Sequence, residues 1–252
     1  YILPVGALLF ASCSDFLEEN PKSFLSPDGF YQTADDANAG LNAVYRTLRD
    51  RNSSMWAVPC WFEWGTDIGE ITDKNTWAFH NEMARLPSTF DASSTNPKDF
   101  WEHTYNHVKD ANNLLKALPG IDFDETQKKQ IEGQTRALRA YLYFDALRVF
   151  SDVPLLLEAS TDINYLETLP RTPAAQVYEA IIADLEYAIS VLPVQWTNDA
   201  DHGRITSGGA AAMLAKVYRT MSGYPLNQTD KLEKARVILE DFVDNKKYGS
   251  HY

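Results

Sequence analysis

Residues 56–80 interleave aromatic rings with carboxylate and amide side chains. The rings are Trp56, Trp61, Phe62, Trp64, Trp77 and Phe79, and the polar groups are Asp67, Glu70, Asp73, Asn75 and His80. Sugars stack their C–H faces on rings and direct their hydroxyl groups to amides and carboxylates. Pockets for small ligands usually combine these two kinds of lining. The segment therefore predicts a carbohydrate-binding site.

Trp77 is the ring that we expect to be exposed, because it lies in a polar stretch without helical periodicity. Asn75 and Asp67 are its predicted partners for sugar hydroxyl groups, and Trp64 is a further candidate ring. The alternative for each tryptophan is a core ring that pins a long loop. For Trp61 and Trp64 the core alternative is favoured, so the predicted site depends mainly on Trp77.

Patterns that would support catalysis or metal binding are incomplete. His103 and His107 have the spacing of paired metal ligands on a helix, but no HExxH frame surrounds them and no third ligand is assignable, so two surface histidines are favoured. Residues 203–209 resemble a phosphate loop without its lysine, and small residues for helix packing explain them better. Residues 198–203 lack the ligands of a calcium loop. The sequence predicts no catalytic residue, metal site or cofactor, and no enzyme; a hydrolase using histidine or acidic clusters is the third hypothesis.

The charge balance of the chain excludes one class of partner. The 252 residues include 23 Lys and Arg against 35 Asp and Glu, which gives a net charge of −12. Nucleic-acid binding needs a basic patch, so no nucleic-acid partner is predicted. Two cysteines exclude a disulfide framework and a cysteine-rich zinc site. Apolar residues make up 44% of the chain, which is enough for a sizeable core.

The first residues are typical of an export signal. Residues 1–12 are apolar and uncharged, too short to span a bilayer, and fit a partial lipoprotein signal peptide. The small residues Ala11 and Ser12 directly precede Cys13, so cleavage there would leave an acylated Cys13 that anchors the protein on a membrane. The alternative is a buried apolar strand that ends in a core cysteine. Residues 13–30 are predicted to be an extended tether.

Apolar side chains recur at helical spacing through most of the remaining chain. The predicted helices are residues 35–49, 100–118, 124–150, 172–192, 206–218 and 232–243. Asp124 and Thr206 are predicted to begin two of them, and Thr172 followed by Pro173 is predicted to cap a third. Strand-like alternation is nearly absent, and short candidates at 61–64 and 153–157 do not change the fold class, which is mostly α.

One interval recurs among the last predicted helices. Val177, Ala211 and Asn245 are each 34 residues apart, which is the length of a tetratricopeptide repeat. The consensus Trp-Leu-Gly signature of that repeat is missing, so the interval alone carries the prediction. We expect a helical array with tetratricopeptide-like helix pairs and long loops.

Five segments share a resemblance to one known family. They are residues 100–115, 133–155, 171–189 and 203–218, and the run CSDFLEENP that starts at Cys13. Together, in their order along the chain, they resemble the SusD/RagB-like outer-membrane glycan-binding lipoproteins. The resemblance implies an α-rich fold of tetratricopeptide-like pairs. It also implies a lipid-anchored, surface-exposed outer-membrane protein that binds oligosaccharide or polysaccharide and delivers it to a SusC-like TonB-dependent transporter.

Two features depart from that family. Ser151 precedes Asp152 where glycine is commoner, and residues 31–252 correspond to the N-terminal part of a SusD-like α domain, with the C-terminal half absent. Because that half usually carries part of the ligand site, the resemblance leaves binding by residues 31–252 alone open. The alternative function is a tetratricopeptide-type adaptor that binds a protein segment in a helical groove.

The most specific of these segments also has a structural interpretation. Its predicted helix carries Arg136, Arg139 and Arg148. Asp145 lies three residues before Arg148, so the two are expected to form an intrahelical ion pair. Leu138 and Phe144 lie on the apolar stripe of the same helix. On the preceding helix, Asn112 is expected to tie a loop by amide hydrogen bonds. These positions are therefore predicted to be scaffold.

Overall fold

The computed structural model of the chain describes residues 27–53, 66 and 95–249. The chain divides into two compact units, Tyr1–Phe30 and Tyr31–Tyr252. In the first unit, α1 (Pro27–Phe30) is a single helical turn. This turn replaces the end of the extended tether that was predicted for residues 13–30.

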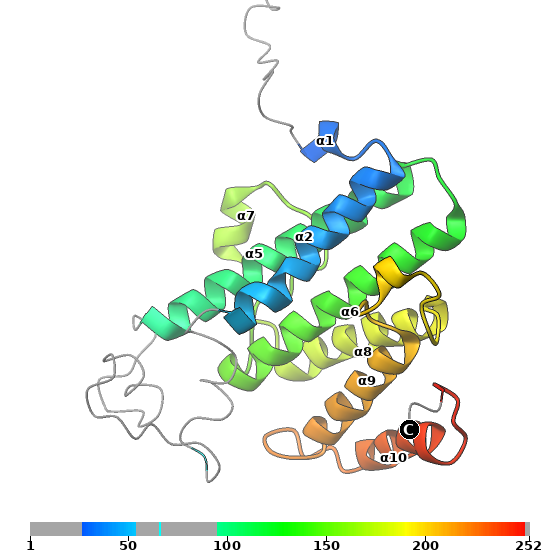
Figure 1. Cartoon of the computed structure of the whole chain (residues 1–252). Helices are drawn as coiled ribbons and strands as arrows, with labels where there is room; N and C mark the ends of the chain where they lie inside the picture. The colour runs from blue at the N-terminus through cyan, green and yellow to red at the C-terminus, as the bar shows by residue number, and fades with distance from the viewer. Residues whose placement is uncertain (1–26, 54–65, 67–94, 250–252) are drawn as a thin grey trace, which may run out of the picture. The chain divides into compact units, whose positions relative to one another are not determined.

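The second unit is built from six long helices within its described residues. They are α2 (Ala34–Ser53), α5 (Thr95–Ala117), α6 (Glu125–Phe150), α8 (Ala174–Val191), α9 (Ser207–Met221) and α10 (Lys231–Val243). Helices that are consecutive in this order pack on one another, and α6 and α8 share the most extensive contact (Figure 1). The mostly α fold class is confirmed.

Shorter elements fill the connections. They are η2 (Leu118–Gly120), α7 (Ile163–Thr168) and η3 (Asp199–Asp201). The sequence analysis missed α7, which begins after Asp162, whose carboxylate accepts a hydrogen bond of 3.2 Å from the Tyr165 N–H. The strand candidate at 153–157 is only an isolated bridge between Val153 and Thr172. The other candidate, 61–64, lies outside the described residues.

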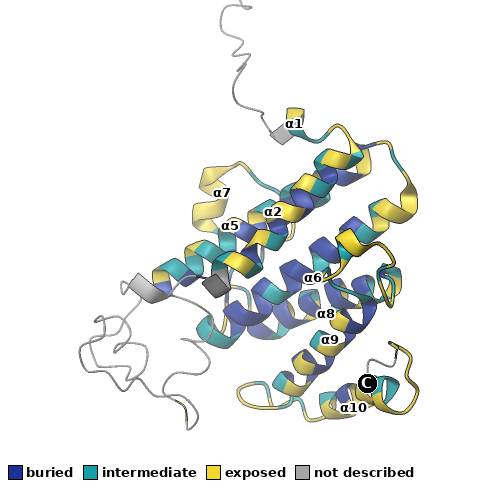
Figure 2. Ribbon diagram, viewed as in Figure 1, coloured by how far each residue is buried: buried dark blue, intermediate teal, exposed yellow. Residues whose placement is uncertain are grey.

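The core follows α6, which is buried on most of its surface (Figure 2). Leu138 and Phe144 are 3% and 1% exposed, so the predicted apolar stripe of this helix is confirmed. One cluster of buried side chains joins α6 to α2 and α5, and a second joins α6 to α8 and α9. The helix thus connects the two ends of the described array.

Local hydrogen bonds fix two of the predicted helix starts. The Asp124 carboxylate accepts from the Gln127 N–H at 2.8 Å, and the Thr206 hydroxyl accepts from the Gly209 N–H at 3.1 Å. Both side chains satisfy backbone donors that have no partner inside the helix. The predicted roles of Asp124 and Thr206 are confirmed.

The start of α8 is capped differently from the prediction. Thr172 does not cap it; the Ala174 N–H donates instead to the Asp152 carboxylate at 2.8 Å. Asp152 follows Ser151, which ends α6 with a φ of 59°. Glycine adopts a positive φ without steric cost, so the Gly-Asp pair that the resemblance led us to expect would fit this position without strain.

The interval of 34 residues has a limited structural counterpart. Val177 and Ala211 lie on consecutive helices, α8 and α9, and both are fully buried. Asn245 lies beyond the last residue of α10, Val243. The interval therefore relates one pair of neighbouring helices and does not extend to the next position.

Candidate functional site

The predicted carbohydrate-binding residues Trp77, Asn75, Asp67 and Trp64 lie outside the described residues, as does the predicted lipidation site Cys13. The aromatic segment follows the last residue of α2, Ser53, and precedes the first residue of α5, Thr95. The two flanking helices, α2 and α5, pack on each other. The structure describes the helical scaffold on either side of this segment in the sequence.

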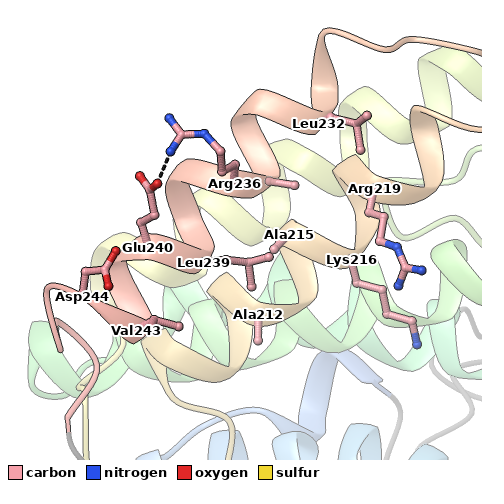
Figure 3. Close-up of a pocket in the computed structure, with 11 residues that line it drawn as sticks. Ala212, Ala215, Lys216, Arg219, Leu232, Arg236, Leu239, Glu240, Val243 and Asp244 are labelled. Atoms are coloured by element: carbon pink, nitrogen blue, oxygen red, sulfur yellow. Dashed lines mark hydrogen bonds and ion pairs between the residues drawn. The ribbon is translucent and has the colours of Figure 1, made fainter.

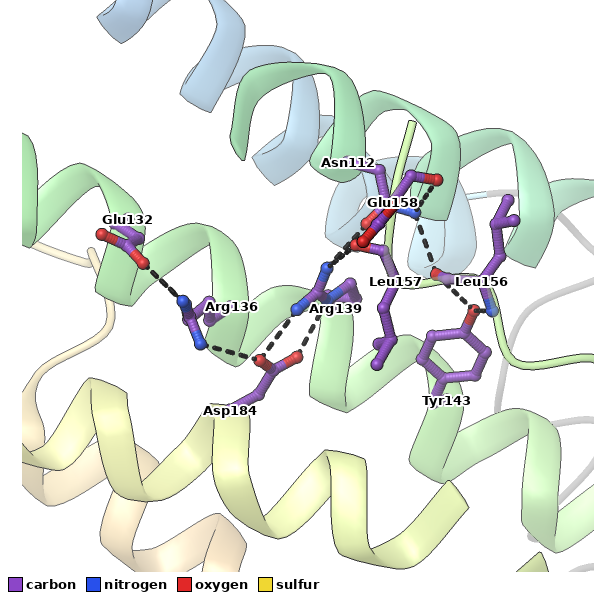
Figure 4. Close-up of polar contacts among 9 residues, drawn as sticks. All are labelled: Asn112, Glu132, Arg136, Arg139, Tyr143, Leu156, Leu157, Glu158 and Asp184. Carbon is purple, nitrogen blue, oxygen red and sulfur yellow. Dashed lines mark hydrogen bonds and ion pairs between the residues drawn. The ribbon is translucent and has the colours of Figure 1, made fainter. Parts of the chain in front are cut away.

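A buried ion pair between α6 and α8 lies at the centre of that scaffold (Figure 4). Arg139 is 5% exposed and Asp184 is 4% exposed. The Arg139 guanidinium donates from Nε to Asp184 Oδ2 at 2.8 Å and from Nη2 to Asp184 Oδ1 at 2.9 Å. This two-point geometry is the strong form of an arginine–carboxylate pair. It fixes the separation and the register of the two most extensively packed helices.

The same guanidinium holds the segment between α6 and α7. Its Nη1 donates to Asn112 Oδ1 at 2.7 Å and to the Leu157 carbonyl at 2.9 Å. The Asn112 amide donates in turn to the carbonyls of Leu156, at 2.9 Å, and Glu158, at 3.3 Å. The prediction that Asn112 ties a loop is confirmed. The sequence analysis placed Arg139 in the scaffold but did not identify its partners.

Tyr143 completes this network from the next turn of α6. Its hydroxyl donates to the Leu156 carbonyl at 2.9 Å and accepts from the Leu156 N–H at 2.7 Å. Burial raises the pKa of the Tyr143 hydroxyl well above its usual value. Leu156 lies in neither a helix nor a strand, and the Tyr143 hydroxyl pairs both of its backbone groups.

Arg136 and Arg148 make contacts at the two edges of the network. Arg136 donates from Nε to Glu132 at 2.8 Å and lies 4.3 Å from the centre of the Tyr187 ring. The Tyr187 hydroxyl donates a hydrogen bond to Glu132, and burial together with this bond raises the pKa of Tyr187 to about 12. Arg148 pairs with Asp145 within α6, as predicted. These contacts are all between helices or within one helix, which agrees with a scaffold role.

One of the two histidines of α5 differs from the prediction. His107 is 3% exposed, so the expectation of a surface histidine is wrong for this residue. It lies on the helix face that also buries Thr104, Val108 and Ala111, at helical spacing. Its ring centre is 4.4 Å from that of His103. Among the described residues, no three His, Cys, Asp or Glu side chains are grouped as metal ligands.

A cleft of about 780 Å³ lies where the α8–α9 connection meets the end of α10. We call it the Trp196 cleft, and its lining is Val194, Gln195, Trp196, His202, Gly203, Arg204, Thr206, Gly208, Gly209, Ala212, Phe242, Val243, Lys246, Tyr248 and Gly249. The Trp196 indole N–H donates to the Ile205 carbonyl at 3.1 Å, which fixes the orientation of the half-buried ring. A volume of this size and a mixed aromatic and polar lining suit a small ligand. The sequence analysis did not select Trp196.

The α8–α9 connection that carries Trp196 is anchored to α2 and α6 through Tyr45. The Tyr45 hydroxyl accepts from the Ile205 N–H at 2.8 Å and donates to Gln134 Oε1 at 2.9 Å. Burial raises the pKa of Tyr45 to about 12, although the Ile205 N–H opposes this shift. Arg204 adds a hydrogen bond of 3.1 Å to Asn42 on α2.

The glycine-rich run at the start of α9 serves packing. A Cβ atom at Gly208 would lie 3.0 Å from Cβ of Tyr248, so a side chain there would displace the wall of the Trp196 cleft. Tyr248 is 8% exposed and stacks on Phe242 with ring centres 4.5 Å apart. The expectation that residues 203–209 contain small residues for packing is confirmed at Gly208.

The described part of the second unit is an array of successive α-helices that pack side by side. No helix in the described ranges combines the length and apolarity needed to cross a bilayer. A SusD-like family profile, described as starch-binding associating with outer membrane, matches residues 15–219. The chain belongs to this family, which confirms the resemblance inferred from its sequence.

Individual relatives agree with this assignment. The chain is 30% identical over 221 residues to SusD-like protein P2 of Formosa agariphila, a match that covers 86% of this chain and 42% of that protein. A SusD homolog from Bacteroides thetaiotaomicron superposes with a TM-score of 0.75 at 25% identity, over 89% of this chain and 43% of that one. A laminarin-binding SusD-like protein gives 0.72 at 28% identity, over 84% and 43%. The chain thus spans less than half the length of these relatives.

Proposed function

We propose that this protein is a cell-surface lipoprotein of the outer membrane that binds oligosaccharide or polysaccharide and delivers it to a SusC-like TonB-dependent transporter, without catalysis. The observation that carries the proposal is the family match over residues 15–219. A solved relative of the same fold binds laminarin. The described residues carry six long helices of this scaffold: α2, α5, α6, α8, α9 and α10.

The proposed glycan contact is the aromatic segment between α2 and α5. Trp77 stacks on a sugar ring, Asn75 and Asp67 bind its hydroxyl groups, and Trp64 is a second ring. The support is the residue content of the segment, which pairs apolar faces with amide and carboxylate groups. Within the described residues, the Trp196 cleft has a mixed aromatic and polar lining. It serves as the comparison site in the test below.

The test is the affinity of two variants for malto-oligosaccharide and laminari-oligosaccharide, measured by affinity electrophoresis and calorimetry. Trp77→Ala should weaken binding more than tenfold, because removing an aromatic anchor costs about 2 kcal/mol or more. Its melting temperature should stay close to that of the wild type. Trp196→Ala should leave the affinity unchanged.

The outcomes separate the alternatives. A large loss of stability in Trp77→Ala would make Trp77 a core residue. Weaker binding in Trp196→Ala with unchanged binding in Trp77→Ala would move the site to the Trp196 cleft. Wild-type protein that binds neither these glycans nor any other of a polysaccharide panel would contradict the proposed function.

Membrane attachment through Cys13 is a separate part of the proposal. The support is the apolar run of residues 1–12 with small residues directly before Cys13. Cys13→Ala should shift the protein from the outer-membrane fraction to the soluble periplasmic fraction, because the acyl chains are the anchor. A variant that still sediments with the outer membrane would show that the anchor lies elsewhere.

A further inference from the structure

The charged side chains that line the Trp196 cleft are all basic. They are Arg204 and Lys246, and His202 adds a ring that can donate a hydrogen bond. Among the described residues that line the cleft, none is Asp or Glu, although the whole chain has 35 of these residues and a net charge of −12. Glu240 and Asp244, near the end of α10, line a neighbouring groove between α9 and α10 instead (Figure 3). The lining of the cleft is therefore complementary to an anionic ligand.

Lys246 keeps its charge available for such a ligand. The Arg204 guanidinium donates to Asp201 Oδ1 at 2.8 Å and to Asn42 Oδ1 at 3.1 Å, so its charge is already shared. Lys247 pairs with Asp241 at 2.9 Å, whereas Lys246 is exposed and forms no ion pair with a carboxylate of the described residues. One available cation beside one that is largely neutralised fits a ligand with a single negative charge.

The turn after α10 holds Lys246 at the cleft. The φ of Lys246 is 49°, in the left-handed region that residues other than glycine seldom adopt. Hydrogen bonds fix this turn, from the Lys247 N–H to the Asp241 carbonyl at 2.9 Å and from the Gly249 N–H to the Lys246 carbonyl at 3.1 Å. The buried Tyr248 anchors the turn against the start of α9. Backbone conformations of this uncommon kind are concentrated at functional sites.

Two aromatic rings supply the apolar part of the lining. Trp196 and Phe242 are both half-buried, and the bond from the Trp196 indole N–H to Ile205 leaves the face of the ring for a ligand. Sugars stack their C–H faces on such rings. A phosphorylated ligand would be expected to meet several available cations, which the described lining does not offer. A ring face beside one available cation instead suits a sugar that carries one carboxylate, which is a uronic acid.

We propose that the Trp196 cleft binds an acidic saccharide, with Trp196 stacked on the ring of a uronic-acid residue and Lys246 paired with its carboxylate. The volume of about 780 Å³ lies in the usual range for small-ligand sites. The proposal goes beyond the capture of a neutral glycan and does not depend on it, because no residue of the cleft belongs to the aromatic segment between α2 and α5.

The test is calorimetric titration of the full-length gene product with trigalacturonate and with its methyl ester, which has the same rings without the charges. The wild type should bind trigalacturonate saturably and the methyl ester about tenfold or more weakly, because only the free carboxylate forms a charge-assisted bond. The affinity for trigalacturonate should fall as the salt concentration rises, since salt screens the ion pair.

Lys246→Gln and Lys247→Gln are a matched pair of variants. The two lysines are adjacent and exposed, but only Lys246 lines the cleft. Lys246→Gln should weaken trigalacturonate binding about tenfold or more, and Lys247→Gln should leave it unchanged. Trp196→Ala should weaken it to a similar extent, because it removes the aromatic anchor. Trp196 also packs against the core, so Lys246→Gln carries the test if Trp196→Ala does not fold.

Wild-type protein that does not bind trigalacturonate, or that binds its methyl ester equally well, would overturn the proposal. Equal effects of Lys246→Gln and Lys247→Gln would also overturn it. Trp77→Ala should leave trigalacturonate binding unchanged, and a loss of binding in this variant would move the acidic saccharide to the aromatic segment. Titrations of the same samples with malto- and laminari-oligosaccharide report on neutral-glycan capture, so a failure of either proposal is distinguishable from a failure of the other.

Discussion

Removing the Asp184 carboxylate should destabilise the fold more than any change to a surface ion pair. In Asp184→Ala, the Arg139 guanidinium loses its contacts at 2.8 and 2.9 Å and keeps only Asn112 and the Leu157 carbonyl. Both charged groups are at most 5% exposed, so water cannot replace the carboxylate. Breaking one side of a buried pair typically costs about 3–5 kcal/mol. This is a large share of the ~5–15 kcal/mol by which a domain is stable.

The magnitude is measurable by urea unfolding and by calorimetry. For a domain of this size, each kcal/mol lowers the melting temperature by about 2–4 °C, so Asp184→Ala should lower it by about 6–20 °C. Glu233→Ala is the control, because it removes the same charge from an exposed pair with Arg236. Exposed pairs contribute little to stability, so this variant should melt close to the wild type.

A double variant separates the ion pair from the packing around it. Arg139→Met combined with Asp184→Leu removes both charges together, and its loss should be smaller than the sum of the two single losses. The reasoning would be refuted if Asp184→Ala and Glu233→Ala had the same melting temperature. Additive losses in the double variant would show that the two side chains stabilise the fold independently.

Two further predictions concern the core. Truncation of the fully buried ring in Phe144→Ala should cost about 3–5 kcal/mol, and unchanged urea unfolding would place the apolar stripe of α6 on another face. The folded-state pKa of Tyr45 is raised from 10.0 to about 12, so its contribution to stability is complete below about pH 10 and is lost as the pH rises toward 12. Melting temperatures of Tyr45→Phe should therefore fall less steeply over this pH range than those of the wild type, and parallel curves would contradict the assignment.

Local signals made several parts of the fold predictable. Asp124 and Thr206 each cap the helix that begins at the next residue by accepting from a backbone N–H three residues along the chain, and their residue types alone indicate this role. The cap of α8 was not predictable in this way, because Asp152 reaches the Ala174 N–H across 22 residues of chain. Helix α7 has only six residues and no buried side chain, so it gives no apolar periodicity.

The polar network was predictable only in part. Asn112 was expected to tie a loop because a polar amide on a packed helix face needs partners, but the sequence did not identify Asp184 as the partner of Arg139, 45 residues away. His107 was predicted to lie on the surface because histidine is polar, but its helix face is the one that also buries Thr104, Val108 and Ala111. Trp196 lies in a polar, aperiodic stretch as Trp77 does, but its cleft was not predictable because the sequence does not show that this stretch meets the end of α10.

The central claim is that this member of the SusD-like family captures a glycan, and the most direct measurement is calorimetric titration of the full-length protein with malto- and laminari-oligosaccharides and a panel of polysaccharides. We predict saturable binding to at least one neutral glycan, with an affinity that changes little between low and high salt because no ion pair is screened. The absence of heat and of saturation with every glycan in the panel would contradict the claim.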